Sequence, residues 1–192
     1  ASAYNIDLLA LTEQVIDTLP ADIYREAENF WNWSIDTQRS TYGMSKETFI
    51  VCEGLKRVWR RAHPAISAIW PALENAARLA INTKEEQFVG EHVSFIKDGR
   101  WLKMLLPSGD CLAYPSPRLT ADGITYMHQH QYSRQWVRAK TYGGKLFENL
   151  CQKYARNIMA YNMPGIEETG YDIVLTVHDE LITEAPVGRA HV

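Results

Sequence analysis

The sequence contains few cysteines, and their arrangement is not typical of a structural bridge. The three thiols, Cys52, Cys111 and Cys151, are odd in number and far apart, and no C-x-x-C pair is present. This pattern argues against both a disulfide framework and a structural zinc site. It favours a reducing, cytoplasmic compartment.

Long hydrophobic runs are also absent. No apolar stretch approaches the roughly 20 residues that a membrane-spanning helix needs. The first residues, ASAYNIDLLAL, lack the basic region followed by an apolar core that is typical of a signal peptide. We therefore expect a soluble protein without a membrane partner. Internal repeats and low-complexity tracts are missing too.

The composition that remains is that of a globular protein. The chain has 192 residues, of which 46% are hydrophobic and 22% are charged, so it is long enough for one sizeable core or two small ones. The formal net charge of −3 excludes a uniformly basic nucleic-acid binder. It leaves local basic patches possible, and these are what contact phosphates.

The first eighty or so residues have a helical pattern. One helix is expected over residues 21–34, and Tyr42-Gly43 marks the break after it. Ser45 is a candidate N-cap for the next helix, in which apolar residues recur at helical spacing opposite a basic face. Pro64 is expected to end that helix and open another, which Pro71 should kink.

Strands are expected after residue 90. Residues 92–96, 100–106 and 111–114 have the short apolar runs and turn residues of three strands. Pro115 and Pro117 are expected to close this sheet before a polar loop. A helix should follow the Gly143-Gly144 break and stop at Met163-Pro164-Gly165.

The last segment, TVHDELITEAP, combines strand-like apolar runs with three consecutive titratable residues, His178, Asp179 and Glu180. The pattern predicts a β-hairpin with buried strands and with this triplet at or beside its tip. A carboxylate held there is suited to a hard cation such as Mg²⁺. Asp179 could equally serve only the turn, and one carboxylate cannot build a two-metal site.

A basic segment, RQWVRAKTYGGK, precedes the last helix. It holds Arg134, Arg138, Lys140 and Lys145 without any acid, interleaved with Trp136 and Tyr142. Such a segment can neutralise phosphates while its aromatic rings pack or stack on bases, and the start of the following helix adds backbone N–H groups. The alternative is a solvated basic face.

Two other groups of residues are weaker candidates. The basic cluster Lys56, Arg57, Arg60 and Arg61 is interpreted as a solvated helix face. His128 and His130 lie two residues apart and could be metal ligands, but no acidic or cysteine partner stands near them in the sequence.

The order of these segments is more specific than any one of them. It resembles the C-terminal polymerase region of family A DNA polymerases, in particular the bacteriophage and prophage branch. The resemblance covers nearly the whole chain. It is carried by AYNIDL, YGMSKETF, LKRVWRRAHPAI, the LLPSG…YP unit, the TYGGKL…EN segment and TVHDE.

The resemblance implies an α+β fold in three parts: a helical fingers segment over residues 1–86, a three-stranded β unit over 87–119, and a palm portion over 120–192. It implies that Asp179 is a ligand of a catalytic Mg²⁺ pair, that His178 lies at the primer 3′ end, and that Glu180 is a neighbouring acid. Arg134, Arg138, Lys140, Tyr142 and Lys145 would contact primer-template DNA. The parent reaction is attack of the primer 3′-hydroxyl on a deoxynucleoside triphosphate.

The chain departs from the family at two motifs. The first polymerase motif, an Asp opening a short strand, is not found, because Asp7 is followed by Leu-Leu and Asp36 by Thr-Gln. The second motif, a nucleotide-gripping fingers helix, is missing as well. We therefore expect a polymerase fragment that is inactive alone. The alternatives are a non-catalytic DNA-binding remnant and a metal-dependent phosphohydrolase that uses His178 and Asp179.

Overall fold

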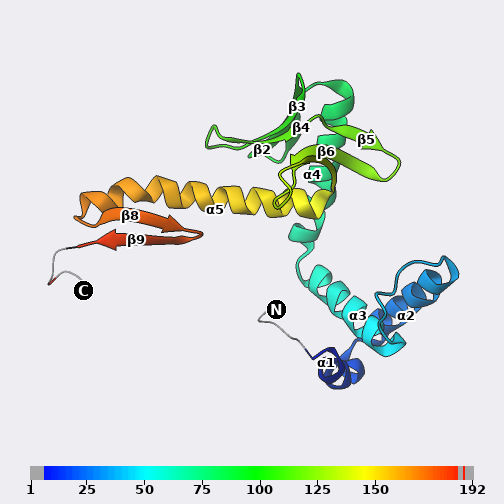
Figure 1. Ribbon diagram of the computed structural model, residues 1–192. Helices are drawn as coiled ribbons and strands as arrows, with labels where there is room; N and C mark the ends of the chain where they lie inside the picture. The colour runs from blue at the N-terminus through cyan, green and yellow to red at the C-terminus, as the bar shows by residue number, and fades with distance from the viewer. Residues whose placement is uncertain (1–6, 186–187, 189–192) are drawn as a thin grey trace. The chain divides into compact units, whose positions relative to one another are not determined.

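The computed structural model describes residues 7–185 and residue 188. It divides into two compact units, Ala1–Ser67 and Ala68–Val192 (Figure 1). Most of the AYNIDL stretch and of the chain's last seven residues, 186–192, lie outside the described residues. None of the helices in the described part combines the length and apolar character that a membrane crossing needs.

Unit 1 is helical, as the sequence predicts. Ser45 caps its last complete helix, because the Ser45 hydroxyl accepts a hydrogen bond of 3.2 Å from the Thr48 N–H. The unit's core is formed by Ile23, Ala27, Phe49, Ile50 and Val51. Its helices are α1 (Leu8–Val15), the 3₁₀ turn η1 (Ile16–Thr18), α2 (Ala21–Asp36) and α3 (Lys46–Ala62).

Helix α4 (Pro64–Thr83) begins at Pro64, as predicted, and continues through Pro71 without interruption. Proline suits the first turn of a helix, because N–H groups there have no acceptor within the helix and the N–H that proline lacks is not needed. Most of α4 belongs to unit 2, where Leu73, Ala76, Ala77 and Ala80 form its buried face. These residues belong to the hydrophobic core of unit 2.

The first sheet of unit 2 has four antiparallel strands in the order β1-β2-β3-β4. Its strands are β1 (Gln87–Val89), β2 (Val93–Asp98), β3 (Trp101–Leu105) and β4 (Cys111–Pro115). The three predicted strands are confirmed, and the short edge strand β1 is an addition. Asp98 pairs with Trp101 across a tight turn whose Gly99 has a φ of +53°, a conformation that favours glycine.

The predicted polar loop after Pro117 is wrong. This part of the chain forms a second antiparallel sheet, β5-β6-β7, from β5 (Arg118–Thr120), β6 (Gly123–Gln129) and β7 (Trp136–Thr141). Its inner face supplies Ile124, which is 1% exposed, with Leu119 and Tyr126 packed beside it. The strands were missed because polar residues interrupt their apolar alternation.

The core of unit 2 lies between the strands and two helices. Phe95, Leu102 and Met104 from the first sheet are fully buried, together with Leu146 and Leu150 of helix α5 (Gly143–Glu168). Helix α5 therefore starts in the core. It does not stop at Met163-Pro164-Gly165 as predicted, since Pro164 lies inside its last turns.

The chain continues into a hairpin of β8 (Asp172–Val177) and β9 (Glu180–Glu184), which contacts α5 and lies alongside it in Figure 1. The hairpin is confirmed, but its expected burial is wrong. Val174, Leu175 and Ile182 are each about half exposed, at 52%, 54% and 45%. A two-stranded sheet packed on one helix leaves its other face open.

Candidate functional site

The His178-Asp179-Glu180 triplet lies at the hairpin tip, as predicted. Val177 pairs with Glu180, so that His178 and Asp179 form a two-residue connection. His178 has a φ of +54°, in the left-handed region that histidine enters more readily than most residues. All three side chains are exposed.

The tip alone does not form a two-metal site. Among the described residues, no group of three His, Cys, Asp or Glu side chains could hold a metal ion. A magnesium pair takes more than one protein carboxylate. The described residues therefore do not fit such a pair by themselves.

The two other candidate histidine ligands have ordinary surroundings. His128 lies on β6 with its ring 6.1 Å from the ring of Tyr126. His130 accepts a hydrogen bond of 3.3 Å at its Nδ1 from the Ser133 N–H, within the β6–β7 connection. No described cluster joins either one to further ligands.

The basic segment is organised by strand β7. Along this strand the residues alternate between exposed and partly buried, so Trp136, Arg138 and Lys140 share one exposed side while Val137 and Ala139 face inward. Arg134 is exposed just before the strand, and Tyr142 and Lys145 are exposed at the start of α5. Strand β7 thus places Trp136, Arg138 and Lys140 on one side, an arrangement that the sequence alone does not show.

A further basic residue joins this side of the sheet through strand pairing. Thr125 of β6 pairs with both Arg118 of β5 and Lys140 of β7, and directly paired residues project to the same side of a sheet. We call Arg118, Trp136, Arg138 and Lys140 the basic face. Arg118 was not among the candidates, because no local pattern connects it to β7.

The side chains of the basic face differ in their bonding. Arg138 donates through Nη1 to the Ser116 carbonyl oxygen at 3.1 Å and to Thr125 Oγ1 at 3.2 Å. Lys140 makes an ion pair of 3.0 Å with Asp122, but both side chains are largely exposed. Such a pair contributes little and is readily exchanged. Arg118 makes no ion pair with any described residue.

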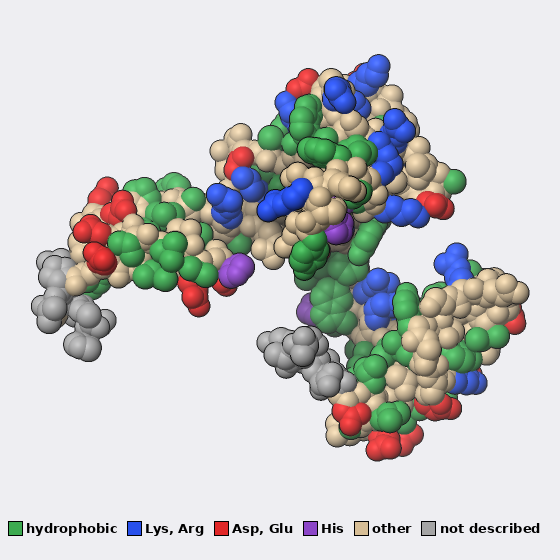
Figure 2. All heavy atoms as spheres, in the orientation of Figure 1, with side chains coloured by type: hydrophobic (Ala, Val, Ile, Leu, Met, Phe, Trp, Pro, Cys, Tyr) green, Lys and Arg blue, Asp and Glu red, His purple; other side chains and the backbone are tan. Residues whose placement is uncertain are grey.

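The basic cluster of unit 1 is different, because acids of α2 and α3 neutralise it. Arg57 pairs with Glu53 at 3.0 Å and with Glu26 at 2.8 Å, and Arg61 pairs with Asp22 at 2.7 Å. This confirms its interpretation as a solvated helix face. Figure 2 shows acidic and basic side chains mixed in unit 1, whereas Lys and Arg gather over the strands of unit 2.

One backbone N–H group at the start of α5 is bonded to a carboxylate of α4. The Gly143 N–H donates to Glu74 Oε2 at 3.0 Å, and Arg78 donates to Glu74 Oε1 at 2.7 Å. Burial opposes the charged form, but these two hydrogen bonds hold the pKa of Glu74 below its usual value. The Gly143 N–H is therefore not available to a phosphate, whereas the predicted contribution of the N–H groups that follow it stays a prediction.

Unit 2 thus carries an exposed basic face on an α+β scaffold. The chain is 34% identical over 141 residues to a protein named DNA polymerase from Bacillus phage SP02. The match covers 70% of this chain and 22% of the phage protein, so the chain spans less than a quarter of that relative. No family model matches, and no solved structure matches.

Proposed function

We propose that this chain is part of a DNA-directed DNA polymerase whose basic face contacts primer-template DNA. The observation that carries the proposal is the alignment of Arg138, Lys140 and Trp136 on one exposed side of β7. The similarity to a phage protein named DNA polymerase supports it. The parent reaction would be template-dependent deoxynucleotidyl transfer.

Within this proposal the chain belongs to family A and carries part of the fingers and palm. The hairpin tip would contribute Asp179 as one ligand of the magnesium pair, with His178 near the primer terminus and Glu180 beside it. The exposed tip and its two flanking strands are a rigid place for such a ligand. When bound, magnesium would neutralise the charge of the transferring phosphate.

We expect the 192-residue chain to be inactive alone, because its described residues do not assemble a two-carboxylate metal site. A primer-extension assay with labelled primer-template, all four deoxynucleotides and Mg²⁺ tests this. Template-dependent extension by the purified chain would contradict the expectation of inactivity. In the polymerase encoded by the complete reading frame, Asp179→Asn should abolish extension, whereas Asp172→Asn, on the same hairpin, should not.

DNA contact by the basic face is tested separately from catalysis. We expect the chain to bind duplex DNA with an affinity that falls as salt rises. Lys140→Ala and Arg118→Ala should each weaken binding and reduce the salt slope by about one. The control is Arg25→Ala, which removes an exposed arginine of α2 that has no ion pair with a described residue. Equal salt slopes for all these proteins would refute this role.

A non-catalytic DNA-binding remnant is the second candidate, and it is favoured because the described residues form no cluster that could hold a metal ion. It predicts the same DNA binding, but no extension even by the protein from the complete reading frame. Primer extension by the protein from the complete reading frame therefore distinguishes the two candidates.

A further inference from the structure

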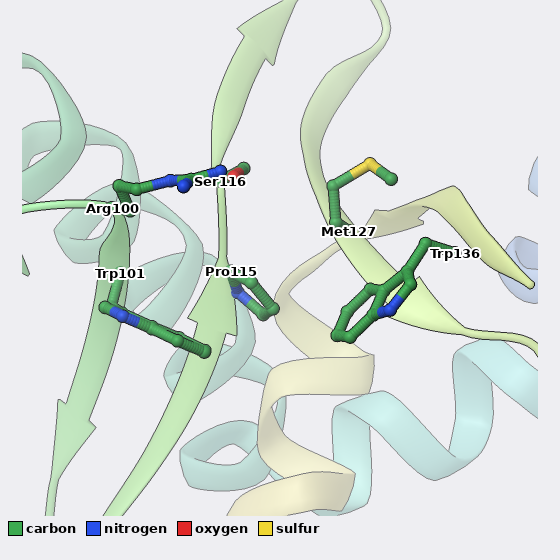
Figure 3. Close-up of a pocket in the computed structure, with 6 residues that line it drawn as sticks. All are labelled: Arg100, Trp101, Pro115, Ser116, Met127 and Trp136. Carbon is green, nitrogen blue, oxygen red and sulfur yellow. The ribbon is translucent and has the colours of Figure 1, made fainter.

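A cavity lies where the two sheets of unit 2 meet, beside the basic face. It has a volume of about 430 Å³ and is lined by Arg100, Trp101, Pro115, Ser116, Met127 and Trp136. Pockets that take small organic groups have volumes of roughly 300–1,000 Å³. Figure 3 shows Trp101 and Trp136 on either side of the cavity with Pro115 between them.

The two tryptophans are available to a ligand. Trp101 is 44% exposed and Trp136 is 61% exposed. Neither indole has a ring contact or a side-chain hydrogen bond with another described residue. Large aromatic rings normally bury most of their surface, so two exposed indoles lining one cavity indicate a surface that planar apolar groups can cover.

The wall between the tryptophans is held in a fixed conformation. Ser116 has a φ of +46°, which is unusual for a residue other than glycine. Two hydrogen bonds hold it: its N–H donates to the Arg100 carbonyl at 2.7 Å, and its carbonyl accepts from Arg138 Nη1 at 3.1 Å. Arg138 of the basic face therefore holds one wall of the cavity, and Trp136 belongs to both the basic face and the cavity lining.

The part of the chain that forms the cavity has an excess of positive charge. Residues 97–141, which include every lining residue, contain seven basic side chains, Lys97, Arg100, Lys103, Arg118, Arg134, Arg138 and Lys140, and three acids, Asp98, Asp110 and Asp122, although the whole chain has a formal net charge of −3. Arg100, at the cavity itself, is exposed and makes no ion pair with a described residue. A ligand that is both aromatic and anionic matches this combination.

We propose that the cavity binds single-stranded DNA, with one unpaired base stacked against Trp136 and Trp101 while the adjoining phosphates lie along the basic face. In a duplex both faces of a base are covered by its neighbours, so indole stacking selects an unstacked base. Same-side residues of β7 repeat every 6–7 Å or so along the strand, which allows Arg138 and Lys140 to meet successive phosphates. This inference rests on the proposed function, and it adds that the DNA in the cavity is single-stranded.

The test measures binding by fluorescence anisotropy, using the full chain and a labelled oligothymidylate of about a dozen nucleotides. An abasic oligomer of equal length carries the same phosphates without bases. Trp101→Ala and Trp136→Ala should each weaken oligothymidylate binding about 10-fold, at an unchanged salt slope. Tyr132→Ala is the control, since Tyr132 is 87% exposed in the β6–β7 connection and does not line the cavity.

The abasic oligomer separates stacking from charge and from folding. Wild type and both tryptophan variants should bind it equally, because only phosphates are present; this equality also shows that the variants keep their fold. Unchanged oligothymidylate binding by the tryptophan variants, or an equal loss for both oligomers, would overturn the inference. If duplex binding nevertheless keeps its salt slope, the proposed DNA contact of the basic face stands. Absence of binding to all three DNAs would overturn both.

Discussion

Replacement of Gly143 by alanine should strongly destabilise unit 2. A Cβ atom at this position would lie 2.0 Å from the Trp70 carbonyl oxygen and 2.5 Å from its carbonyl carbon. These are backbone atoms of α4, so relief requires α5 to move away from α4. Overpacking of this kind costs about 1–3 kcal/mol. Movement of α5 would also break the Gly143–Glu74 hydrogen bond, worth about 1.5–3 kcal/mol because Glu74 is charged.

The two terms together predict a loss of about 2.5–6 kcal/mol in the free energy of unfolding of Gly143→Ala. For a protein of this size that lowers Tm by roughly 10 °C. Thermal and urea unfolding followed by far-UV circular dichroism measure it. Gly144→Ala is the matched control, because its Cβ meets only the exposed Tyr142 ring, at 3.0 Å, which can rotate away.

Alanine is the better helix former by about 0.5–1 kcal/mol, so Gly144→Ala should be neutral or slightly stabilising. The reasoning is refuted if Gly143→Ala and Gly144→Ala have the same stability. It is also refuted if Gly143→Ala is as stable as the parent, since the close approach of α5 to α4 would then be dispensable.

Two further predictions concern the pH dependence of the free energy of unfolding. Burial raises the pKa of Tyr114 to about 12, despite a hydrogen bond of 3.1 Å from Asn149, so the unfolded chain loses the proton first. Stability should fall by up to about 2–3 kcal/mol between about pH 10 and pH 12, and Tyr114→Phe should remove this Tyr114 component of the alkaline loss in urea unfolding. The pKa of Glu74 is lowered in the folded protein. The ionised carboxylate therefore stabilises the fold above the ordinary pKa of 4.5, and this stabilisation is lost as the pH falls through the lowered folded pKa. Glu74→Gln should therefore be less stable than the parent at neutral pH, and the difference should shrink as the pH falls below 4.5; a difference that does not change with pH would contradict the assignment.

The helices of unit 1 and α4 could be predicted because their signals are local. Ser45 caps its own helix through a residue three positions on, and Pro64 begins α4 at the first position. The terminal hairpin could be predicted for the same reason. Whether its apolar face is covered depends on other segments, and no local pattern carries that information. The exposure of Val174 and Leu175 was therefore missed.

The strands from residue 118 to 141 were missed because the alternation of apolar residues is weak there. Inward positions of β6 and β7 include His128, Ala139 and Thr141, none of which is a strong apolar signal. The link between Gly143 and Glu74 joins residues 69 positions apart, so it exists only in the folded chain. Four of the five predicted DNA contacts flank or lie on one exposed strand, but Arg118, Arg100 and Trp101 have no sequence pattern that connects them to it.

The charge that DNA would meet is set by the register of β7 rather than by the composition of the chain. In a helix, Arg138 would point to the side opposite Trp136 and Lys140, because successive residues rotate by about 100°. In the strand they share one side, and a shift of β7 by one residue would turn Val137 and Ala139 outward instead. That register is fixed by the pairing of buried Ile124 with buried Thr141 on the opposite side of the sheet. The packing of the core therefore determines where the positive charge is presented, and a chain with a formal charge of −3 acquires a basic surface through its fold.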